Sequence, residues 1–332
     1  MTAAPPDRDV RTTDFEHGVT AIDTEYVRPL LDASHLIVDR GRAAFVDTGV
    51  NDSVPLLLKA LQQRDIDAGD VNYVFLTHVH LDHAGGAGLL MQHLPNAVAL
   101  LHPRGARHMT DPGKLVKGSE AVYGKENVKR MYGEILPIEK HRVRVVADNE
   151  EVRLGERTLQ CLFTEGHARH HYCLADPASD GVFTGDSFGI SYRDFDTAGG
   201  EFIFPTTTPV HFDPPEAHKA IDRIMEREPA RLYLTHYSRV TDLPRLADDM
   251  HQRIDDFVAI AMDHATAIPR TEAMQAAMFS YLKTELGKHG YSVNEQMLHS
   301  LLDVDVALNT MGLEHWLDYF ERGSHSSRTA HS

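Results

Sequence analysis

A dense run of histidine and aspartate side chains, directly after an apolar segment, constrains this chain more than any other feature. The apolar segment VNYVFL (71–76) has the β-branched and aromatic composition of a buried strand. Four metal-binding side chains follow within six residues: His78, His80, Asp82 and His83. Imidazole and carboxylate groups are ligands that suit zinc and iron. A polar loop whose histidines only cap a helix is the alternative, but side chains packed this closely would repel and desolvate one another without a cation. The run therefore predicts a metal site.

Three further candidate ligands each follow a different predicted strand: His167, Asp186 and His236. Taken singly, each has an ordinary explanation as a turn residue or a hydrogen-bonded core residue. Together with the first run they form a pattern, because every candidate stands at or just after the end of a strand. Loops at strand ends commonly carry functional side chains on a rigid scaffold. We therefore expect all seven side chains to converge on one site.

The remaining apolar pattern predicts an α/β fold. Short runs typical of strands occupy residues 35–38, 43–46, 71–76, 97–101, 142–146, 158–163, 172–175, 181–183 and 231–234. Apolar residues with helical spacing lie between them, at 54–61 and 217–225. Strands with interspersed helices indicate a layered arrangement in which helices cover sheets.

The pattern becomes helical after Pro244. Four amphipathic stretches follow, with the third around residues 297–302 and the fourth ending near Gly323. We therefore expect four parts: a loose N-terminal segment at 1–20, a catalytic domain at 21–240, a helical C-terminal unit at 241–322 and a disordered tail at 323–332.

Composition and charge exclude several classes of protein. Lys and Arg number 33 against 49 Asp and Glu, so the formal net charge is −16. Such an acidic chain lacks the basic footprint that nucleic acids require. Its two cysteines, Cys161 and Cys173, exclude a disulfide framework and are expected to be buried. No secretory signal and no membrane span is visible. We expect a cytoplasmic protein that acts on a small molecule, without membrane or nucleic-acid partners; homo-oligomer formation is left open.

The order of the motifs resembles the metallo-β-lactamase superfamily, and is closest to its glyoxalase II-like and lactonase-like hydrolases. The motifs are T-H-x-H-x-D-H-x-G-G at 77–86, G-H at 166–167, T-G-D at 184–186 and T-H at 235–236, with FVDTG at 45–49 upstream. This resemblance covers roughly residues 30–240. It implies an α/β fold of the four-layer αββα type, with a two-metal site at one edge and, here, a C-terminal helical appendage.

The resemblance also implies how the ligands divide. The first metal would be held by His78, His80 and His167, the second by Asp82, His83 and His236, with Asp186 bridging. Asp47 would orient ligand histidines. Two divalent metal ions are expected; zinc is favoured, and iron or manganese is compatible with the same donors. In many relatives the third motif reads G-H-T-P-G-H, whereas this chain has Ala168, Arg169, His170 and His171 after Gly166-His167. Whether His170 or His171 contacts the site is left open.

These ligands imply hydrolysis: a metal-bridging hydroxide attacks a thioester, ester or lactone carbonyl, and Asp82 moves a proton toward the leaving group. The alternative is a non-hydrolytic diiron protein that binds or reduces dioxygen or nitric oxide, although such relatives usually carry Glu at the place of His80. A non-catalytic binding module with a structural metal is less favoured, because structural zinc sites are built mostly with Cys.

Three further features bear on the chemistry. Tyr192 or Tyr237 would be able to donate to an oxyanion, although a core or surface role suits both better. Gly185-Asp186-Ser187-Phe188-Gly189 matches G-x-S-x-G, but no helical pattern follows, so a Ser187 nucleophile is not favoured. Residues 104–144 hold ten Lys or Arg against five Asp or Glu. This excess suits an anionic acyl substrate, although a solvated surface is the favoured interpretation.

Overall fold

The structure is a computed structural model that describes residues 9–207, 210–292 and 294–329. It divides into two compact units. Unit 1 comprises the described residues up to Phe163 together with His170–Gly185 and Pro229–Thr241. Unit 2 comprises Thr164–Arg169, Asp186–Glu228 and the described residues from Asp242 onward.

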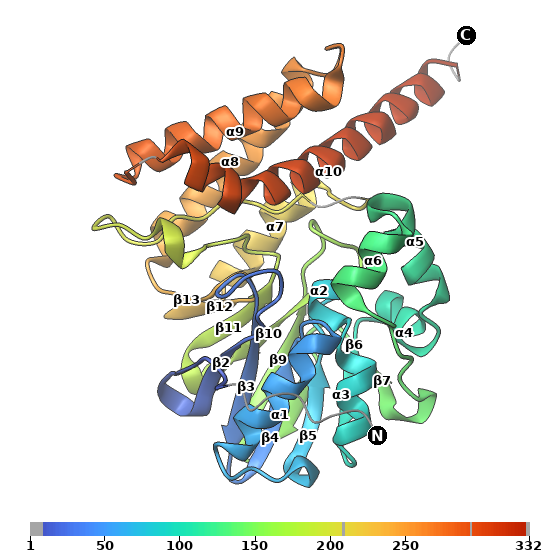
Figure 1. The fold of residues 1–332 in the computed structure, drawn as a ribbon, viewed down its shortest axis with the longest axis vertical. Helices are drawn as coiled ribbons and strands as arrows, with labels where there is room; N and C mark the ends of the chain where they lie inside the picture. Colours follow the sequence, from blue (N-terminus) through green and yellow to red (C-terminus); the bar gives the residue numbers. More distant parts are fainter. Residues whose placement is uncertain (1–8, 208–209, 293, 330–332) are drawn as a thin grey trace. The chain divides into compact units, whose positions relative to one another are not determined.

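Unit 1 contains two mixed β-sheets (Figure 1). The first has seven strands in chain order: β1 (Thr12–Asp14), β2 (Val19–Asp23), β3 (Ala33–Asp39), β4 (Arg42–Val46), β5 (Val71–Phe75), β6 (Val98–Leu101) and β7 (Val143–Val145). Neighbours are antiparallel from β1 to β4 and parallel from β4 to β7. The second sheet has six strands in the order β13 (Ser238–Val240), β12 (Arg231–Leu234), β11 (Gly181–Gly185), β10 (Tyr172–Asp176), β9 (Arg157–Phe163) and β8 (Glu151–Leu154).

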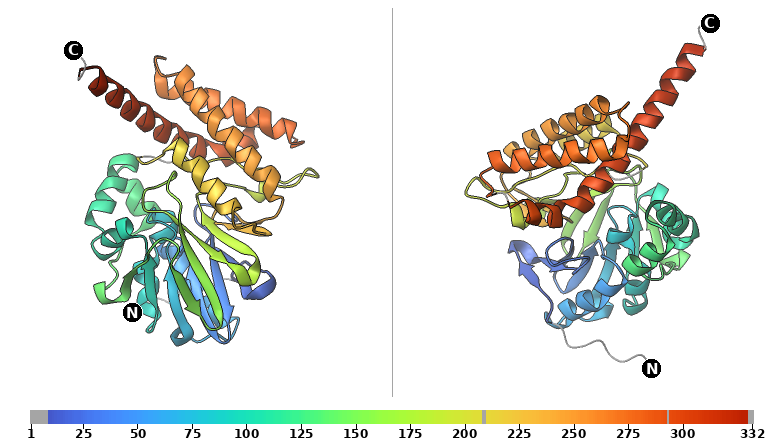
Figure 2. Two further views of the ribbon diagram at one scale, coloured as in Figure 1. Left: turned by 180° about the vertical axis from the view of Figure 1, so that it is seen from behind. Right: turned by 45° about the horizontal axis from the view of Figure 1, so that its top comes forward.

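Two apolar layers hold unit 1 together. Between the sheets, buried side chains of both pack against one another, among them Ile37, Phe75, Leu174 and Tyr233. On the outer face of the first sheet, strand residues pack against helices α1 (Val54–Gln62) and α3 (Ala87–His93). Figures 1 and 2 show these helices beside the strands. Both faces of the first sheet are therefore buried, which explains the nearly continuous apolar runs of β4 to β6.

Four more helices belong to unit 1: α2 (Leu81–Ala84), α4 (Pro103–Thr110), α5 (Gly113–Tyr123) and α6 (Lys125–Tyr132). Helix α2 begins directly after the loop that leaves β5, so it carries part of the predicted metal-binding run. Leu81 of α2 packs in a small apolar cluster with Val128 and Tyr132 of α6. This cluster fixes α5 and α6 next to the run.

Unit 2 is mainly helical, with α7 (Pro214–Met225), α8 (Leu243–Asp263), α9 (Arg270–Lys288) and α10 (Glu295–Thr329). Helices α8, α9 and α10 contact one another (Figure 2). Helix α10 also holds preceding loop residues, because Asn309 accepts a hydrogen bond from the Thr207 amide and Asp305 accepts one from the Tyr192 phenol. In the described part of the chain, no helix is long and apolar enough to cross a membrane.

The predicted fold class is confirmed: two mixed sheets with flanking helices form the αββα arrangement, and C-terminal helices follow it. All nine predicted strands are present, and both cysteines are buried and free. The prediction missed the strands β1, β2, β8 and β13. It also separated the last two helical stretches, which are one helix, α10. This helix runs through the expected end near Gly323 to Thr329, and residues 330–332 of the expected tail lie outside the described residues.

Candidate metal centre

The run after β5 folds into a tight turn that gathers three imidazoles. The chain is extended at His80 and then enters the single turn of α2, which contains Asp82 and His83. The ring of His78 lies 4.4 Å from the ring of His80 and 4.1 Å from that of His83, measured between centroids. His78 and His83 are buried, whereas His80 and Asp82 are partly exposed. The predicted grouping of these four residues is therefore seen in the structure of unit 1.

His236 joins this run from the second sheet. It follows β12, and one ligand atom from each of Asp82, His83 and His236 lies within 4.8 Å of the others. The Nε2 atom of His236 is 3.5 Å from Oδ2 of Asp82, and Nε2 of His83 is 3.8 Å from the same oxygen. Two imidazole nitrogens thus face one carboxylate, which is the arrangement that a shared cation requires.

Hydrogen bonds on the far side of each ring fix which nitrogen faces the cluster. Nδ1 of His83 lies 2.8 Å from Oδ2 of Asp47, and Nδ1 of His236 lies 2.9 Å from the carbonyl oxygen of Leu31. Each Nδ1 therefore carries the proton and donates it to an oxygen. The unprotonated Nε2 is left with its lone pair toward Asp82, as in metal-ligating histidines.

Asp47 holds several of these elements at once. It is buried at the end of β4 with a φ of 57°, a left-handed conformation that Asp adopts more readily than most residues. Besides His83, its carboxylate accepts hydrogen bonds from the Thr77 amide and hydroxyl, and from the Thr235 hydroxyl. The Thr77 hydroxyl in turn lies 3.1 Å from Nδ1 of His78. Asp47 therefore contacts His83 directly and also holds the residues that precede His78 and His236. These contacts suit the role in orienting ligands that the resemblance implied.

Unit 2 brings the other two predicted ligands together. Nε2 of His167 lies 3.4 Å from Oδ2 of Asp186, and both side chains are buried. Nδ1 of His167 is 3.1 Å from the carbonyl oxygen of Thr206, so the His167 ring is oriented in the same way as His83 and His236. The Asp213 amide donates to the carbonyl of Gly166, which holds the His167 loop against the start of α7.

His170 and His171, left open by the sequence, both lie beside the first run. The His170 ring is 5.7 Å from the ring of His80 and 6.2 Å from that of His78. The His171 ring is 4.9 Å from that of His78, and His171 has no exposed surface. At the position where the resemblance would expect a Pro-Gly turn, this chain therefore places the His170 imidazole beside the rings of His78 and His80.

Sequence reasoning missed Asp32 and two tyrosines near the run. Asp32 is fully buried and accepts a hydrogen bond from the Thr24 hydroxyl. Burial raises the pKa of Asp32 to about 7, against the opposing attraction of His236 and His83. Tyr26 and Tyr132 share a hydrogen bond of 3.0 Å between their hydroxyls. These residues stand outside the motifs, on the β2–β3 loop and at the end of α6, so no spacing signal could have grouped them.

Other candidates have different roles. The Tyr192 phenol lies 3.2 Å from both carboxylate oxygens of Asp305. The Ser187 hydroxyl donates to the carbonyl of Thr164, and no helix follows Ser187 directly. Tyr237, next to His236, is 5% exposed. The contacts of Tyr192 and Ser187 agree with the sequence-based preference, which favoured neither an oxyanion donor at Tyr192 nor a nucleophile at Ser187.

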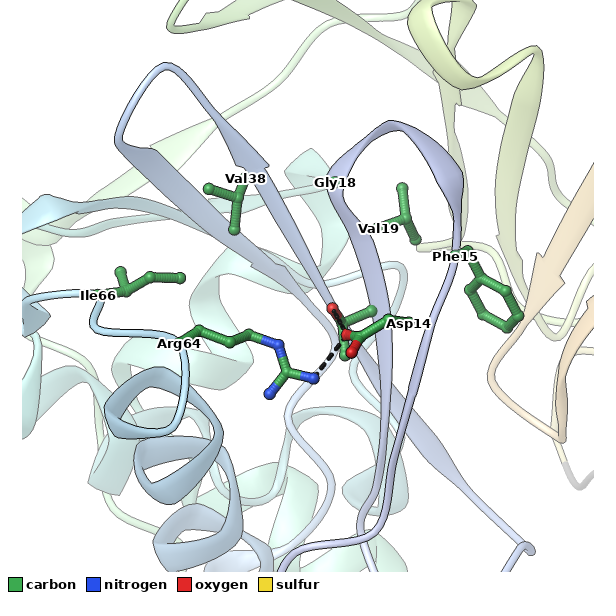
Figure 3. Close-up of a pocket in the computed structure, with 8 residues that line it drawn as sticks. Asp14, Phe15, Gly18, Val19, Val38, Arg64 and Ile66 are labelled. Carbon is green, nitrogen blue, oxygen red and sulfur yellow. Dashed lines mark hydrogen bonds and ion pairs between the residues drawn. The ribbon is translucent and has the colours of Figure 1, made fainter.

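The cationic segment 104–144 is mostly solvated. Arg142 is occupied by backbone carbonyls of Met91, Leu94 and Ala97, and Arg144 pairs with Glu150. The other eight basic residues are exposed on and around α4 to α6: Arg104, Arg107, Lys114, Lys117, Lys125, Lys129, Arg130 and Lys140. A separate pocket of unit 1 lies against β1, β2 and β3 (Figure 3). Its Arg64 pairs with Asp14 at 2.6 Å, and it includes no predicted metal ligand.

Comparison with known proteins defines the class. The profile of the metallo-beta-lactamase superfamily matches residues 28–236, and this protein belongs to that superfamily. The metallo-beta-lactamase fold-containing protein ST1585 of Sulfurisphaera tokodaii is 26% identical over 70% of this chain and 81% of its own. A crystal structure described as ST1585 from Sulfolobus tokodaii superposes with a TM-score of 0.62 at 23% identity, covering 90% of this chain and 98% of the other.

Two further relatives extend the comparison. A probable hydroxyacylglutathione hydrolase of Schizosaccharomyces pombe is 27% identical over 51% of each chain. The structure of the metallo-beta-lactamase family protein TTHA1429 from Thermus thermophilus has a TM-score of 0.61 at 19% identity, over 92% of this chain and 94% of that one.

The donor set suits a divalent metal ion. Neutral imidazoles with locked Nδ1–H groups and a facing carboxylate are the ligands of zinc and related ions. No cysteine takes part, since Cys161 and Cys173 are buried in strands β9 and β10. The residues therefore fit the metal-binding chemistry of the superfamily, and donors of this kind accept zinc, iron and manganese.

Proposed function

We propose that this protein is a dinuclear metal-dependent hydrolase that cleaves a thioester, ester or lactone bond of a small molecule. The observation that carries the proposal is the arrangement around Asp82, where Nε2 of His83 and Nε2 of His236 face one carboxylate while their Nδ1 atoms are tied to Asp47 and Leu31. Membership of the superfamily and the similarity to a protein named a hydroxyacylglutathione hydrolase support the same reaction type.

In this proposal His78, His80 and His167 would hold one ion, Asp82, His83 and His236 would hold the other, and Asp186 would be a ligand of both. Chain connectivity supports adding the pair His167–Asp186 to the donors of unit 1. A side chain on Gly185 would lie 2.6 Å from Oγ1 of Thr77, so Gly185 packs directly against the residue before His78. Asp186 is the next residue, and consecutive Cα atoms are about 3.8 Å apart.

The same reasoning applies to His167. Its neighbour three residues on, His170, lies beside the rings of His78 and His80. Three residues of fully extended chain span at most roughly 11 Å. This short length of chain supports the assignment of His167 to the same site as His78 and His80.

Two bound divalent ions would supply a hydroxide at neutral pH and would polarise the substrate carbonyl. Asp82 is the residue of this chain best placed to move the proton. Its side chain is 24% exposed, against 0% for His83 and 6% for His236, so it is the member of its group that solvent and substrate reach most easily. Asp82 would carry a proton toward the leaving thiolate or alkoxide.

The residue at position 80 favours hydrolysis over the diiron alternative. A glutamate there would add a carboxylate and so favour the more highly charged ferric state, whereas an imidazole ligand adds no negative charge. The exposed basic residues on α4 to α6 are compatible with an anionic acyl substrate, which would be drawn to this side of unit 1.

Substitution of Asp82 tests the scheme. We expect Asp82→Asn to lower kcat for a thioester or lactone by about 100-fold or more, because the amide cannot accept the proton. Asp70→Asn is the matched control, since Asp70 is a surface carboxylate of the same unit paired with Arg42. Initial rates and metal content are measured for both variants. Full activity with full metal content in Asp82→Asn would refute the assigned role of Asp82.

A further inference from the structure

Two histidines of neighbouring helices face each other in unit 2. His218 lies on α7 and His251 on α8, and the two helices contact each other. The Nδ1 atoms of the two rings are 2.7 Å apart, whereas the ring centroids are 5.0 Å apart and the ring planes differ by 6°. Because the nitrogens are far closer together than the centroids, the rings approach each other through their Nδ1 edges.

A carboxylate from the opposite helix lies at the outer nitrogen of each ring. Nε2 of His218 is 3.1 Å from Oδ1 of Asp255 on α8, and Nε2 of His251 is 3.3 Å from Oδ1 of Asp222 on α7. Both helices therefore carry the spacing His-x-x-x-Asp, and each aspartate faces the histidine of the other helix. An ionised carboxylate only accepts hydrogen bonds, so it favours a hydrogen on each outer nitrogen.

Two neutral imidazoles carry too few hydrogens for these contacts. Each neutral ring has one N–H, which gives two hydrogens for three contacts: two with carboxylates and one between the Nδ1 atoms. If both hydrogens are on the outer nitrogens, two lone pairs face each other at 2.7 Å. If one hydrogen is on an inner nitrogen instead, a lone pair faces a carboxylate. A cation bound by both Nδ1 atoms removes this conflict.

The outer carboxylates also orient the rings as metal ligands are oriented. Histidines that bind metals almost always donate a hydrogen bond from one ring nitrogen to a carboxylate, carbonyl or water, and ligate with the other nitrogen. Imidazole suits copper, nickel and zinc. Two metal–nitrogen bonds of about 2.0–2.1 Å at a right angle place the nitrogens about 3 Å apart, which is close to the separation seen here.

The surface position of the pair allows this adjustment. The side chains of His218 and His251 are 27% and 31% exposed, so the rings can turn toward a common ion and water can complete its coordination. The surrounding charge favours a divalent cation, because Asp222 and Asp255 add two negative charges and neutral imidazoles add none. Lys219, the neighbour of His218, is paired with Glu216 at 2.7 Å.

We propose that His218 and His251 form a metal-binding site for a divalent copper, nickel or zinc ion, held by the two Nδ1 atoms and by water. The ion links α7 to α8. The site shares no residue with the candidate metal centre, and the inference does not depend on the proposed hydrolase function. With two protein donors only, the site is expected to lose zinc during gel filtration. Copper binds nitrogen donors more tightly than zinc does, so copper is the probe.

Copper titration of the full-length protein tests the proposal. The protein is loaded with zinc and freed of excess metal by gel filtration, and one equivalent of Cu²⁺ is then added. We expect the electron paramagnetic resonance spectrum to show coupling to two nitrogen donors. The Kd for Cu²⁺ is measured by competition with a chelator. His218→Asn and His251→Asn should each raise this Kd by about 10-fold or more, because each removes one of the two donors.

His299→Asn is the matched control. His299 lies on α10 in unit 2, and its Nδ1 is 2.7 Å from Asp303, but its ring stacks on Phe279 instead of facing an imidazole. This variant should keep the wild-type Kd for Cu²⁺. Circular dichroism of each variant confirms that it is folded, and the zinc content is measured before and after copper is added.

Three outcomes would overturn the inference. An equal Kd in the wild type and in the folded His218→Asn and His251→Asn proteins would leave the place between the rings to a proton. Release of zinc in proportion to the copper bound, in the wild type and the variants alike, would place the copper in the candidate metal centre. A wild-type spectrum with coupling to one nitrogen would exclude a shared ion. None of these results depends on whether the protein hydrolyses a thioester or a lactone, so the two proposals can fail separately.

Discussion

Asp47 connects three short segments that carry or adjoin histidine donors. Its carboxylate accepts from His83 and from the Thr77 and Thr235 hydroxyls, which precede His78 and His236. An asparagine of the same shape would have one accepting oxygen fewer, and its NH₂ group would face one of these donors. We expect Asp47→Asn to weaken metal binding by about 10- to 100-fold, as measured by competition with a chromophoric chelator.

Asp39→Asn is the control for this prediction. Asp39 also accepts two hydrogen bonds in unit 1, from the amides of Glu156 and Arg157 at 2.7 and 3.2 Å, but it touches no predicted ligand. The Asp39→Asn substitution is expected to lower the free energy of unfolding and to leave the metal affinity unchanged. Equal metal affinities for the two variants would show that Asp47 has only a structural role.

His35 makes stability depend on pH. It lies in the core between the sheets, against Phe183 and Tyr233, and burial lowers its pKa from 6.5 to about 3. Between about pH 6.5 and pH 3, His35 is therefore protonated in the unfolded chain but neutral in the folded protein. The stabilisation is complete above pH 6.5 and is lost as the pH falls from there toward 3.

Between pH 7.5 and 5.5 we expect His35 to cost the protein about 1.4 kcal/mol of unfolding free energy. Urea unfolding at the two pH values measures this loss in the wild type and in His35→Gln, which should lack it. His141→Gln, which removes an exposed histidine, should behave like the wild type. A His35→Gln protein with the full wild-type pH dependence would be incompatible with a neutral buried His35.

At the scale of elements, α3 packs too closely on the chain after α6 to accept a side chain at Gly88. A Cβ atom there would lie 2.0 Å from the carbonyl oxygen of Leu136. Because the obstacle is backbone, Gly88→Ala should destabilise the protein by about 1–3 kcal/mol. Gly118, in the middle of α5, has no atom within 4 Å of such a Cβ. Gly118→Ala should instead stabilise by up to about 1 kcal/mol.

Chemical denaturation of both glycine variants checks these opposite signs. Destabilisation by Gly118→Ala of the same size as by Gly88→Ala would mean that the close approach of α3 to Leu136 is not what distinguishes the two sites.

Most of the apolar strands were predictable from sequence, but four strands were missed: β1, β2, β8 and β13. The segment of β2, VTAID, is fully buried but contains Thr and Asp, which interrupt its apolar pattern. β4, β5 and β6 are buried on both faces and read as continuous apolar runs. β1 and β13 have three residues each, and β8 alternates exposed with buried residues. Such segments give too little periodicity to separate them from loops. The two predicted helices are separated by a stretch around Asn309 and Gly312 that lacks the apolar spacing, yet α10 continues through it. There the Asn309 side chain accepts a hydrogen bond from the Thr207 amide.

At the scale of the whole molecule, the motifs pointed to candidate donors that lie together in unit 1, because strand ends set their positions. His78, Asp82, His83 and His236 are brought together by the order of strands in the two sheets of unit 1. The tyrosine pair and Asp32 depend instead on how loops and helices fold back over that edge, which no local pattern encodes. The division of the seven donors between two metals is still a prediction, and it is the central claim of the account.

Metal stoichiometry tests that claim most directly. Untagged protein is dialysed against excess zinc, freed of unbound metal by gel filtration, and analysed by plasma mass spectrometry. We predict two zinc ions per chain in a colourless protein. The account assigns His78, His80 and His167 to one ion and Asp82, His83 and His236 to the other, and proposes that Asp186 is shared. One ion or none per chain would contradict the account.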